Sequence, residues 1–337
     1  MNPSFRPAPW LAGRHLETIV PALIPASPVP APSSARVVRV SPEAAVLVLV
    51  SRPDGEARGT LVLVHGIGGS AESGYMRRTA SRALAYGWVV ARMNCRNCGG
   101  SEALSRTLYN AGQSDDVGRV LEDLDAGGAP RPFAAVGFSL GGNLVLRYAG
   151  RAGSGSAADA VATVSPPVDL DACCRALERR ENLLYHAHFT LSLCRILRRI
   201  HRVRGLAGGK PEFRRIRTLR RLDALYTAPD GGYASAEDYY ERASAGPDLE
   251  GVAVPALVLS AENDPFVPEE IFRGHRGAGA GRVRFEHPRR GGHLGFWQSH
   301  APRFWAAEAV LRFLAETLPT GRQRAGLELP RGFRLPA

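Results

Sequence analysis

The chain has 337 residues, of which 45% are hydrophobic, and this composition fits a globular protein with one large domain or two of average size. Its formal net charge of +11 comes almost wholly from arginine, with Lys210 the only lysine. The arginines are scattered along the chain and no nucleic-acid-binding module is recognised, which argues against nucleic acid as a partner. Because no apolar run approaches the roughly 20 residues of a membrane-spanning helix, and the N-terminal residues lack the apolar core of a secretory signal, we expect a cytoplasmic protein.

The predicted elements alternate between strands and helices along most of the chain. Residues 1–35 are rich in proline and are predicted to form an irregular N-terminal arm, apart from a short helix at 15–23. Apolar runs predict strands at 35–40, 45–52, 59–66, 88–94, 132–136, 159–167, 254–264 and 282–288. Helical patterns indicate helices at 75–87, 114–126, 143–150 and 301–318. Such alternation predicts the α/β class, with a mostly parallel sheet covered by helices on both faces.

A long helical stretch interrupts this alternation at about 170–245. The sequence therefore predicts a single α/β domain over 1–337 with a helical cap inserted at 168–250, followed by a C-terminal tail at 319–337. Within the cap, arginines of 195–205 and 214–221 are separated by apolar residues at roughly helical spacing. Amphipathic helices with solvated basic faces explain this pattern; transient contact with an anionic membrane surface, or with a negatively charged substrate, is the alternative.

The segment GFSLGGN at 137–143 places Ser139 between two glycines, after a predicted strand and before a predicted helix. In that context G-x-S-x-G is the pattern of a nucleophile elbow, a sharp turn that projects the serine oxygen from the edge of the sheet. The positive end of the helix that follows would lie beside that oxygen. An ordinary strand-to-helix turn with a capping serine is the simpler interpretation of these residues alone.

A nucleophilic serine needs a base, and the chain has nine histidines. His293 lies in a glycine-rich loop between the last strand and the last helix, and it follows an acidic residue at a strand end, Asp264. The order Ser139, Asp264, His293 matches that of elbow-type catalytic triads. Glu262 is the main rival of Asp264.

In this interpretation His293 takes the serine proton, and Asp264 holds the imidazole in the required tautomer. The oxyanion formed by attack on an ester needs hydrogen-bond donors, which we expect to be the backbone N–H groups of Leu140 and Ile67. His65 precedes Ile67 in the same loop and is predicted to order that loop. No metal and no organic cofactor is expected. Cys95 and Cys98 form a C-x-x-C, but no second pair has metal-ligand spacing, so we interpret it as incidental.

Beyond these residues, the sequence resembles the YheT-like branch of the α/β-hydrolases, which includes mammalian α/β-hydrolase-domain lipases and fungal alcohol acyltransferases. The motifs that carry the resemblance span most of the chain: GRHLETIVPAL, LVHGIGGSAESGYMRRTA, NCRNCGGSEALSRTLYNAGQSDD, GFSLGGNLVLRYAG, DGGYASAEDYYERAS, NDPFVP and GGHLGFW. It implies an α/β-hydrolase fold and places nucleophile, acid and base on Ser139, Asp264 and His293. Two positions depart from the branch, because Asn97 and Gly99 stand where glycine and serine are usual.

The resemblance also draws attention to the segment YNAGQSDD, in which we interpret Tyr109 as buried packing and Asp116 as an acid at a helix start. It implies hydrolysis of carboxylic esters, including acyl lipids, and we expect a serine esterase that acts through an acyl-enzyme on short- to medium-chain acyl groups. Apolar residues in 183–197 exceed what one buried helix face needs, so Leu191 and Leu193 are predicted to line an acyl pocket. The alternatives are an alcohol O-acyltransferase with the same triad and, less favoured, a non-catalytic acyl-ligand-binding protein.

Overall fold

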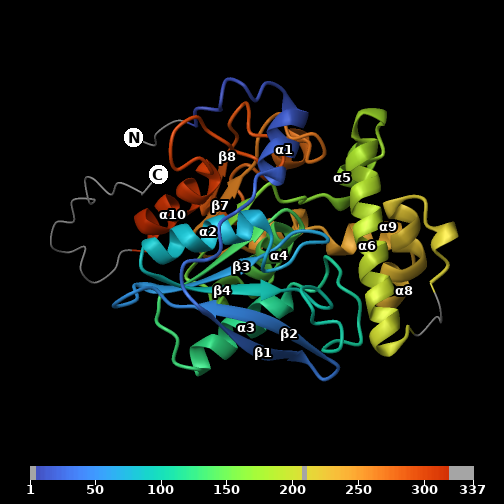
Figure 1. Cartoon of the computed structure of the whole chain (residues 1–337), viewed down its shortest axis with the longest axis horizontal. Helices are drawn as coiled ribbons and strands as arrows, with labels where there is room; N and C mark the ends of the chain where they lie inside the picture. The colour runs from blue at the N-terminus through green and yellow to red at the C-terminus, as the bar shows by residue number, and fades with distance from the viewer. Residues whose placement is uncertain (1–4, 207–210, 319–337) are drawn as a thin grey trace.

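The computed structural model describes residues 5–206 and 211–318, arranged around one eight-stranded sheet (Figure 1). The strand order is β1-β2-β4-β3-β5-β6-β7-β8. Strands β1 and β2 form an antiparallel hairpin, β2 pairs antiparallel with β4, and all other neighbours are parallel. The strands are β1 (Ser33–Ser41), β2 (Ala44–Ser51), β3 (Gly59–Val64), β4 (Trp88–Asn94), β5 (Phe133–Phe138), β6 (Ala160–Val164), β7 (Ala256–Leu259) and β8 (Val283–Glu286).

Two pairs of helices cover the two faces of the sheet, as the alternating sequence pattern predicts. Helices α2 (Gly74–Ala85) and α10 (Trp305–Thr317) pack with Leu61 and Leu63 of β3. Helices α3 (Asp115–Ala126) and α4 (Leu140–Ala152) pack with Val62 and Val64 on the opposite face. Successive side chains of a strand point to opposite faces, so a wholly apolar strand such as β7 is buried on both. The predicted α/β fold with a mostly parallel sheet is confirmed.

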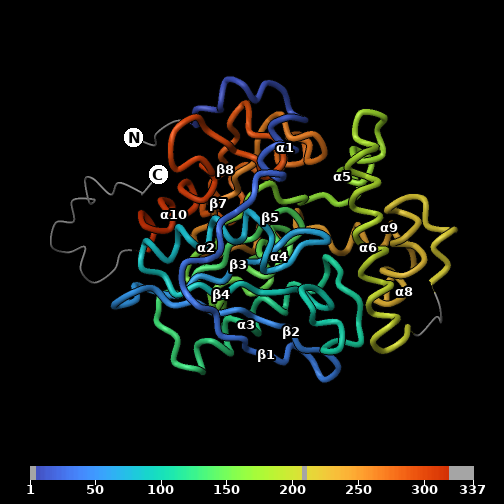
Figure 2. Tube along the Cα trace, in the orientation of Figure 1, coloured from blue at the N-terminus to red at the C-terminus, as the bar shows by residue number. Residues whose placement is uncertain are grey.

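Between β6 and β7 the chain forms a separate group of helices that lies to one side of the sheet (Figure 2). Its members are α5 (Leu170–Leu177), α6 (Leu183–Arg204), α7 (Leu219–Leu222), the π-helical turn η4 (Asp223–Thr227), α8 (Ala228–Asp230) and α9 (Ala236–Ala243). This group occupies the range predicted for a cap. The predicted C-terminal tail at 319–337 lies outside the described residues.

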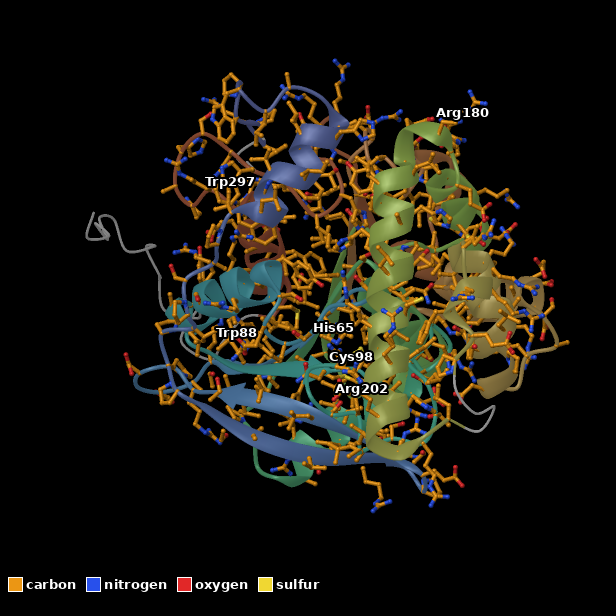
Figure 3. All side chains as sticks on the ribbon, turned by 45° about the vertical axis from the view of Figure 1, so that its right-hand side comes forward. His65, Trp88, Cys98, Arg180, Arg202 and Trp297 are labelled. Carbon is orange, nitrogen blue, oxygen red and sulfur yellow. The ribbon has the colours of Figure 1, made fainter. Side chains whose placement is uncertain are left out.

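The 22-residue helix α6 is amphipathic. Ile196, Leu197 and Ile200 are buried, whereas Arg195 and Arg198 are exposed. Figure 3 shows the whole helix, with Arg180 just before its start and Arg202 near its end. The solvated basic face expected from the sequence is therefore present, and contact of that face with a membrane surface stays a prediction. Across residues 5–206 and 211–318, no helix combines the length and the apolar character needed to cross a membrane.

The N-terminal arm contains helix α1 (Arg14–Leu23), close to the short helix predicted at 15–23. It lies beside the carboxyl-terminal part of the fold, near β8 (Figure 1). Several strand predictions were too long at their carboxyl ends: the run 254–264 forms a strand only over Ala256–Leu259, and its remainder is a loop. Asp264 lies in that loop, so the residues wrongly predicted as strand are the ones that connect β7 to the candidate site.

Candidate active site

Ser139 occupies the sharp turn between β5 and α4 with φ 52° and ψ −124°, a conformation that non-glycine residues rarely adopt. The two flanking glycines allow the turn. A Cβ atom at Gly137 would lie 2.3 Å from the Gly141 carbonyl oxygen, and one at Gly141 would lie 2.4 Å from the Val64 carbonyl oxygen. Both approaches are to backbone, so any larger residue would force the turn open. The local geometry is therefore that of an elbow rather than an ordinary capped helix start.

The three residues singled out by chain order lie in one hydrogen-bonded row. His293 Nε2 is 2.9 Å from Ser139 Oγ, and His293 Nδ1 is 2.8 Å from Asp264 Oδ2. Because a carboxylate accepts, Nδ1 carries the proton toward Asp264 and leaves Nε2 free to accept from the serine hydroxyl. All three residues are at least nine-tenths buried. The rival acid, Glu262, is exposed.

Each partner in this row is held in place by further contacts. The other oxygen of Asp264, Oδ1, accepts hydrogen bonds from the backbone N–H groups of Phe266 and Val267, at 3.1 and 3.0 Å. The Phe266 ring packs against the His293 imidazole, with ring centroids 4.1 Å apart. The carboxylate orientation and the imidazole plane are therefore fixed by neighbours on the Asp264 loop.

Helix α1 fixes the base loop and the acid loop together, a role that the sequence did not predict. The buried Glu17 carboxylate accepts hydrogen bonds from Asn263 Nδ2 at 2.7 Å and from the backbone N–H of Gly291 at 3.0 Å. The Thr18 hydroxyl accepts from the backbone N–H of His293 itself at 2.9 Å. The available signal is in GRHLETIVPAL, where an acid and a threonine are adjacent just before the apolar second half of the helix.

The loop after β3 supplies the second wall of the site. The buried His65 donates from Nδ1 to the Gly66 carbonyl oxygen at 2.8 Å and accepts at Nε2 from the Cys95 N–H at 3.1 Å. Burial lowers the pKa of His65 to about 4, so the ring is neutral near pH 7. The expectation that His65 orders this loop agrees with these contacts. Cys98 is also buried, and no group of three or more metal-ligating side chains occurs among the residues that the structure describes.

Ile67 and Leu140, the predicted oxyanion donors, line the same cavity as Ser139. Within the described part of the chain, neither backbone N–H donates a hydrogen bond to another protein group. Leu140 is the first residue of α4, where a helix leaves its N–H groups without partners. Both amides are thus available to an oxygen bound beside Ser139.

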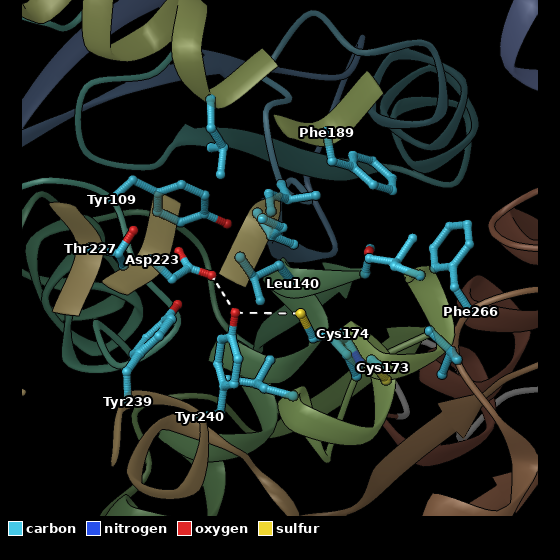
Figure 4. Close-up of a pocket in the computed structure, with 18 residues that line it drawn as sticks. Tyr109, Leu140, Cys173, Cys174, Phe189, Asp223, Thr227, Tyr239, Tyr240 and Phe266 are labelled. Carbon is cyan, nitrogen blue, oxygen red and sulfur yellow. Dashed lines mark hydrogen bonds between the residues drawn. The ribbon is translucent and has the colours of Figure 1, made fainter. Parts of the chain in front are cut away.

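The cavity that opens beside Ser139 is mainly apolar, and most of its wall comes from α5, α6, α7, η4 and α9 (Figure 4). Leu193 lines it, as predicted. Leu191 does not: it is 51% exposed, and the prediction that it lines this pocket is wrong. Positions two residues apart on a helix are rotated by about 200°, so they cannot both face one cavity.

Several polar side chains in this cavity were not recognised from the sequence. Tyr109 is buried, as expected, yet its hydroxyl has no hydrogen-bond partner in the described structure. Asp223 and Thr227, both on η4, and Tyr240 on α9 also line the wall. Asp116, by contrast, lies in the first turn of α3 as expected and forms a buried ion pair with Arg96 at 2.5 Å.

Comparisons with known proteins identify the family of this chain. The family model of the alpha/beta hydrolase fold matches residues 59–299. The chain is 32% identical to the "Putative esterase YheT" of Escherichia coli over 70% of each chain. It is 27% identical to the monoacylglycerol lipase of Saccharomyces cerevisiae and 28% to the mouse phospholipase ABHD3, over 77% and 74% of this chain; these matches span only 59% and 61% of those two relatives.

Solved structures share the fold at low sequence identity. An esterase of Pyrococcus furiosus superposes with a TM-score of 0.61 at 14% identity, covering 86% of this chain and 92% of that one. A puromycin-hydrolysing peptidase of Mycobacterium tuberculosis superposes with a TM-score of 0.58 at 20% identity, covering 92% of this chain and 42% of that one. These two likenesses concern the architecture alone.

Proposed function

Because the chain belongs to the α/β-hydrolase family, among its esterase- and lipase-type members, we propose that it cleaves carboxylic esters through an acyl-enzyme formed on Ser139. The observation that carries this proposal is the continuous row from Ser139 Oγ through the His293 imidazole to Asp264, at 2.9 and 2.8 Å. An unreactive binding protein has no use for three polar groups buried in that order. This weighs against a non-catalytic acyl-ligand-binding protein.

The proposed reaction has two halves. Ser139 Oγ bonds to the ester carbonyl carbon while His293 Nε2 takes the serine proton, and the oxyanion accepts hydrogen bonds from the Ile67 and Leu140 N–H groups. When the carbon–oxygen bond to the alcohol breaks, His293 returns the proton to the leaving alkoxide. Water then attacks the acyl-enzyme with His293 again as base, which releases the acid and restores Ser139. Asp264 stabilises the imidazolium in both halves.

The direct test is covalent trapping. A fluorophosphonate should add one phosphonyl group to the protein, and peptide mass spectrometry should place it on Ser139, since only an activated serine displaces fluoride rapidly. Prior incubation with a p-nitrophenyl ester should slow the labelling. An adduct on another residue, or no adduct while the ester is hydrolysed, would refute the assignment of Ser139.

An alcohol acyltransferase is the second candidate, because the same acyl-enzyme can be resolved by an alcohol instead of water. One relative, at 25% identity over 76% of this chain, is named "Medium-chain fatty acid ethyl ester synthase/esterase 2". Product analysis in graded ethanol separates the two functions. A hydrolase gives mainly free acid at low alcohol, whereas a transferase gives mainly ethyl ester.

Within this function, we propose that the helices between β6 and β7, over the predicted cap range 168–250, form a pocket for short- to medium-chain acyl groups. Each buried methylene should strengthen binding by about 0.8 kcal/mol until the pocket is full. On p-nitrophenyl esters, kcat/KM should therefore rise with chain length, reach a maximum, and fall for the longest chains. Leu193→Trp should move the maximum to shorter chains without abolishing acetate hydrolysis.

Leu191→Trp is the matched control, because it adds the same bulk two positions away on the exposed side of α6. Its chain-length profile should be that of the unmodified protein. If Leu191→Trp and Leu193→Trp change the profile equally, or if the profile is flat, the cavity beside Ser139 does not hold the acyl chain.

A further inference from the structure

A carboxylate without a cationic partner lies in the wall of the apolar cavity. Asp223 is 5% exposed, and the described residues include no salt bridge to it. The nearby Arg220 is instead paired with Asp171, Glu178 and Glu237. Tyr240 donates a hydrogen bond to Asp223 Oδ2 at 2.7 Å. Hydrogen bonds from Tyr240 and Thr227 and the nearby charge of Arg220 stabilise this carboxylate, but a buried carboxylate in an apolar wall without a salt bridge is still unfavourable.

A second polar group reaches the same cavity from a different part of the fold. The hydroxyl of Tyr109, in the loop that precedes α3, has no hydrogen-bond partner in the described structure, and the residue is 8% exposed. The Cys95 thiol lies near it, but a thiol bonds only weakly. Figure 4 shows the Tyr109 hydroxyl and the Asp223 carboxylate turned toward the interior of the pocket. An unpaired buried hydroxyl is unfavourable unless a ligand satisfies it.

The backbone at Asp223 is also unusual. Asp223 and Thr227 begin and end a π-helical turn, and both line the cavity. Such turns are rare and occur frequently at functional sites. The turn is the third independent feature that points to a polar subsite within the apolar pocket.

We propose that this subsite recognises a hydroxyl group carried by the acyl chain of the substrate, so that the enzyme hydrolyses hydroxyacyl esters in preference to plain alkyl ones. The substrate O–H donates to Asp223, and its oxygen accepts the hydrogen bond of the Tyr109 hydroxyl. This inference rests on the proposed ester hydrolysis at Ser139. A methyl terminus would leave the Tyr109 hydroxyl unpaired and would offer Asp223 no bond beyond those it already has within the protein.

Other chain ends fit the subsite less well. A terminal carboxylate is repelled by Asp223. An ammonium group offers no acceptor to the Tyr109 hydroxyl proton, and the positive charge of Arg220 already acts on Asp223. A hydroxyl is both donor and acceptor without charge, and of the three it alone can donate to Asp223 while it accepts the proton of the Tyr109 hydroxyl.

The test compares p-nitrophenyl esters in isosteric pairs, such as 6-hydroxyhexanoate with heptanoate, over a series of chain lengths. At the length that places the hydroxyl between Asp223 and Tyr109, kcat/KM for the hydroxy ester should exceed that for the alkyl ester by about tenfold or more, because sites built to bond a hydroxyl reject the analogue that lacks it. Tyr109→Phe and Asp223→Asn should each bring this ratio close to one.

Tyr86→Phe is the matched control, because its hydroxyl bonds to Glu308 near the opposite face of the sheet, and it should leave the ratio unchanged. Tyr109→Phe removes a hydroxyl that no described protein group holds, so it should preserve the fold even if Asp223→Asn does not. Fluorophosphonate labelling of each variant reports whether the rest of the site is intact.

The ratio should also depend on pH. Burial raises the pKa of Asp223 to about 6, while hydrogen bonds from Tyr240 and Thr227 and the charge of Arg220 lower it. The titratable groups around it are Tyr239 and Tyr240 from α9, Arg220 from α7, Cys174 from α5 and Tyr109. The ionised carboxylate is the better acceptor, so the hydroxyl preference should be full at pH 8 and fall as the pH drops through 6. Any pH effect that is common to both esters cancels in the ratio, and Asp223→Asn should remove the pH dependence.

Two kinds of failure are distinguishable. If neither ester is hydrolysed and no phosphonyl adduct forms on Ser139, the proposed function itself is wrong. If both esters are hydrolysed but the alkyl ester is preferred at every length, or Tyr109→Phe leaves the ratio unchanged, or an ω-ammonium ester is preferred to the hydroxy ester, the hydroxyl subsite is overturned while ester hydrolysis stands.

Discussion

Replacing Ser139 with alanine should lower kcat by roughly 10⁴-fold or more, as loss of a triad nucleophile does in other serine hydrolases. The Ser139 oxygen is the one that would carry the acyl group, and it lies 2.9 Å from His293 Nε2. The sharp turn at Ser139 tolerates only a small change of side chain. Alanine keeps the Cβ and therefore the elbow. The measurement is steady-state hydrolysis of p-nitrophenyl butyrate, with circular dichroism to verify that the fold is retained.

Ser34→Ala is a suitable control, since the Ser34 hydroxyl bonds to the Val50 carbonyl oxygen on the exposed β1–β2 hairpin. It should keep the activity of the unmodified protein. An alanine variant at 139 that hydrolyses the ester at the original rate would show that catalysis occurs elsewhere in the molecule.

Replacing His293 with alanine should have a comparable effect, again roughly 10⁴-fold in kcat, because the serine then lacks the base that removes its proton. Two other histidines provide controls. His186 accepts a hydrogen bond from the Leu219 backbone N–H at 2.9 Å, and His275 lies beside Gly246. Neither contacts Ser139, so His186→Ala and His275→Ala should stay within about tenfold of the original kcat. Equal damage from either one would mean that the base has been misassigned.

The parts of this structure that could be predicted from sequence are those with a strong local or ordered signal. Fully apolar strands such as β7 are evident as apolar runs in the sequence. The close backbone approaches at Gly137 and Gly141 require glycine at both positions, which is why the elbow is visible as a sequence motif. The chain order of Ser139, Asp264 and His293 predicted that the three side chains lie together, because the carboxyl ends of parallel strands meet at one edge of the sheet.

The parts that could not be predicted depend on how distant segments pack. The cavity contact of Leu193, and the exposure of Leu191, follow from the rotation of α6 against its neighbours, which apolar character alone does not fix. Tyr109 was correctly expected to be buried, but burial does not reveal that its hydroxyl faces a cavity built by another segment. The role of Asp223 requires the π-helical turn, which has no sequence signal that we recognise.

The bonds from α1 to the loops of Asp264 and His293 have a consequence for how the protein is made. They join residues that are 246 to 275 positions apart in sequence. At the usual rate of translation, on the order of tens of seconds pass between the synthesis of Glu17 and that of its partners. During that interval the hydrogen-bond partners of Glu17 and Thr18 have not been synthesised, and contacts between residues so far apart in sequence form slowly. A nascent chain therefore remains inactive until nearly all of it has left the ribosome, and the first helix to be made is among the last to dock.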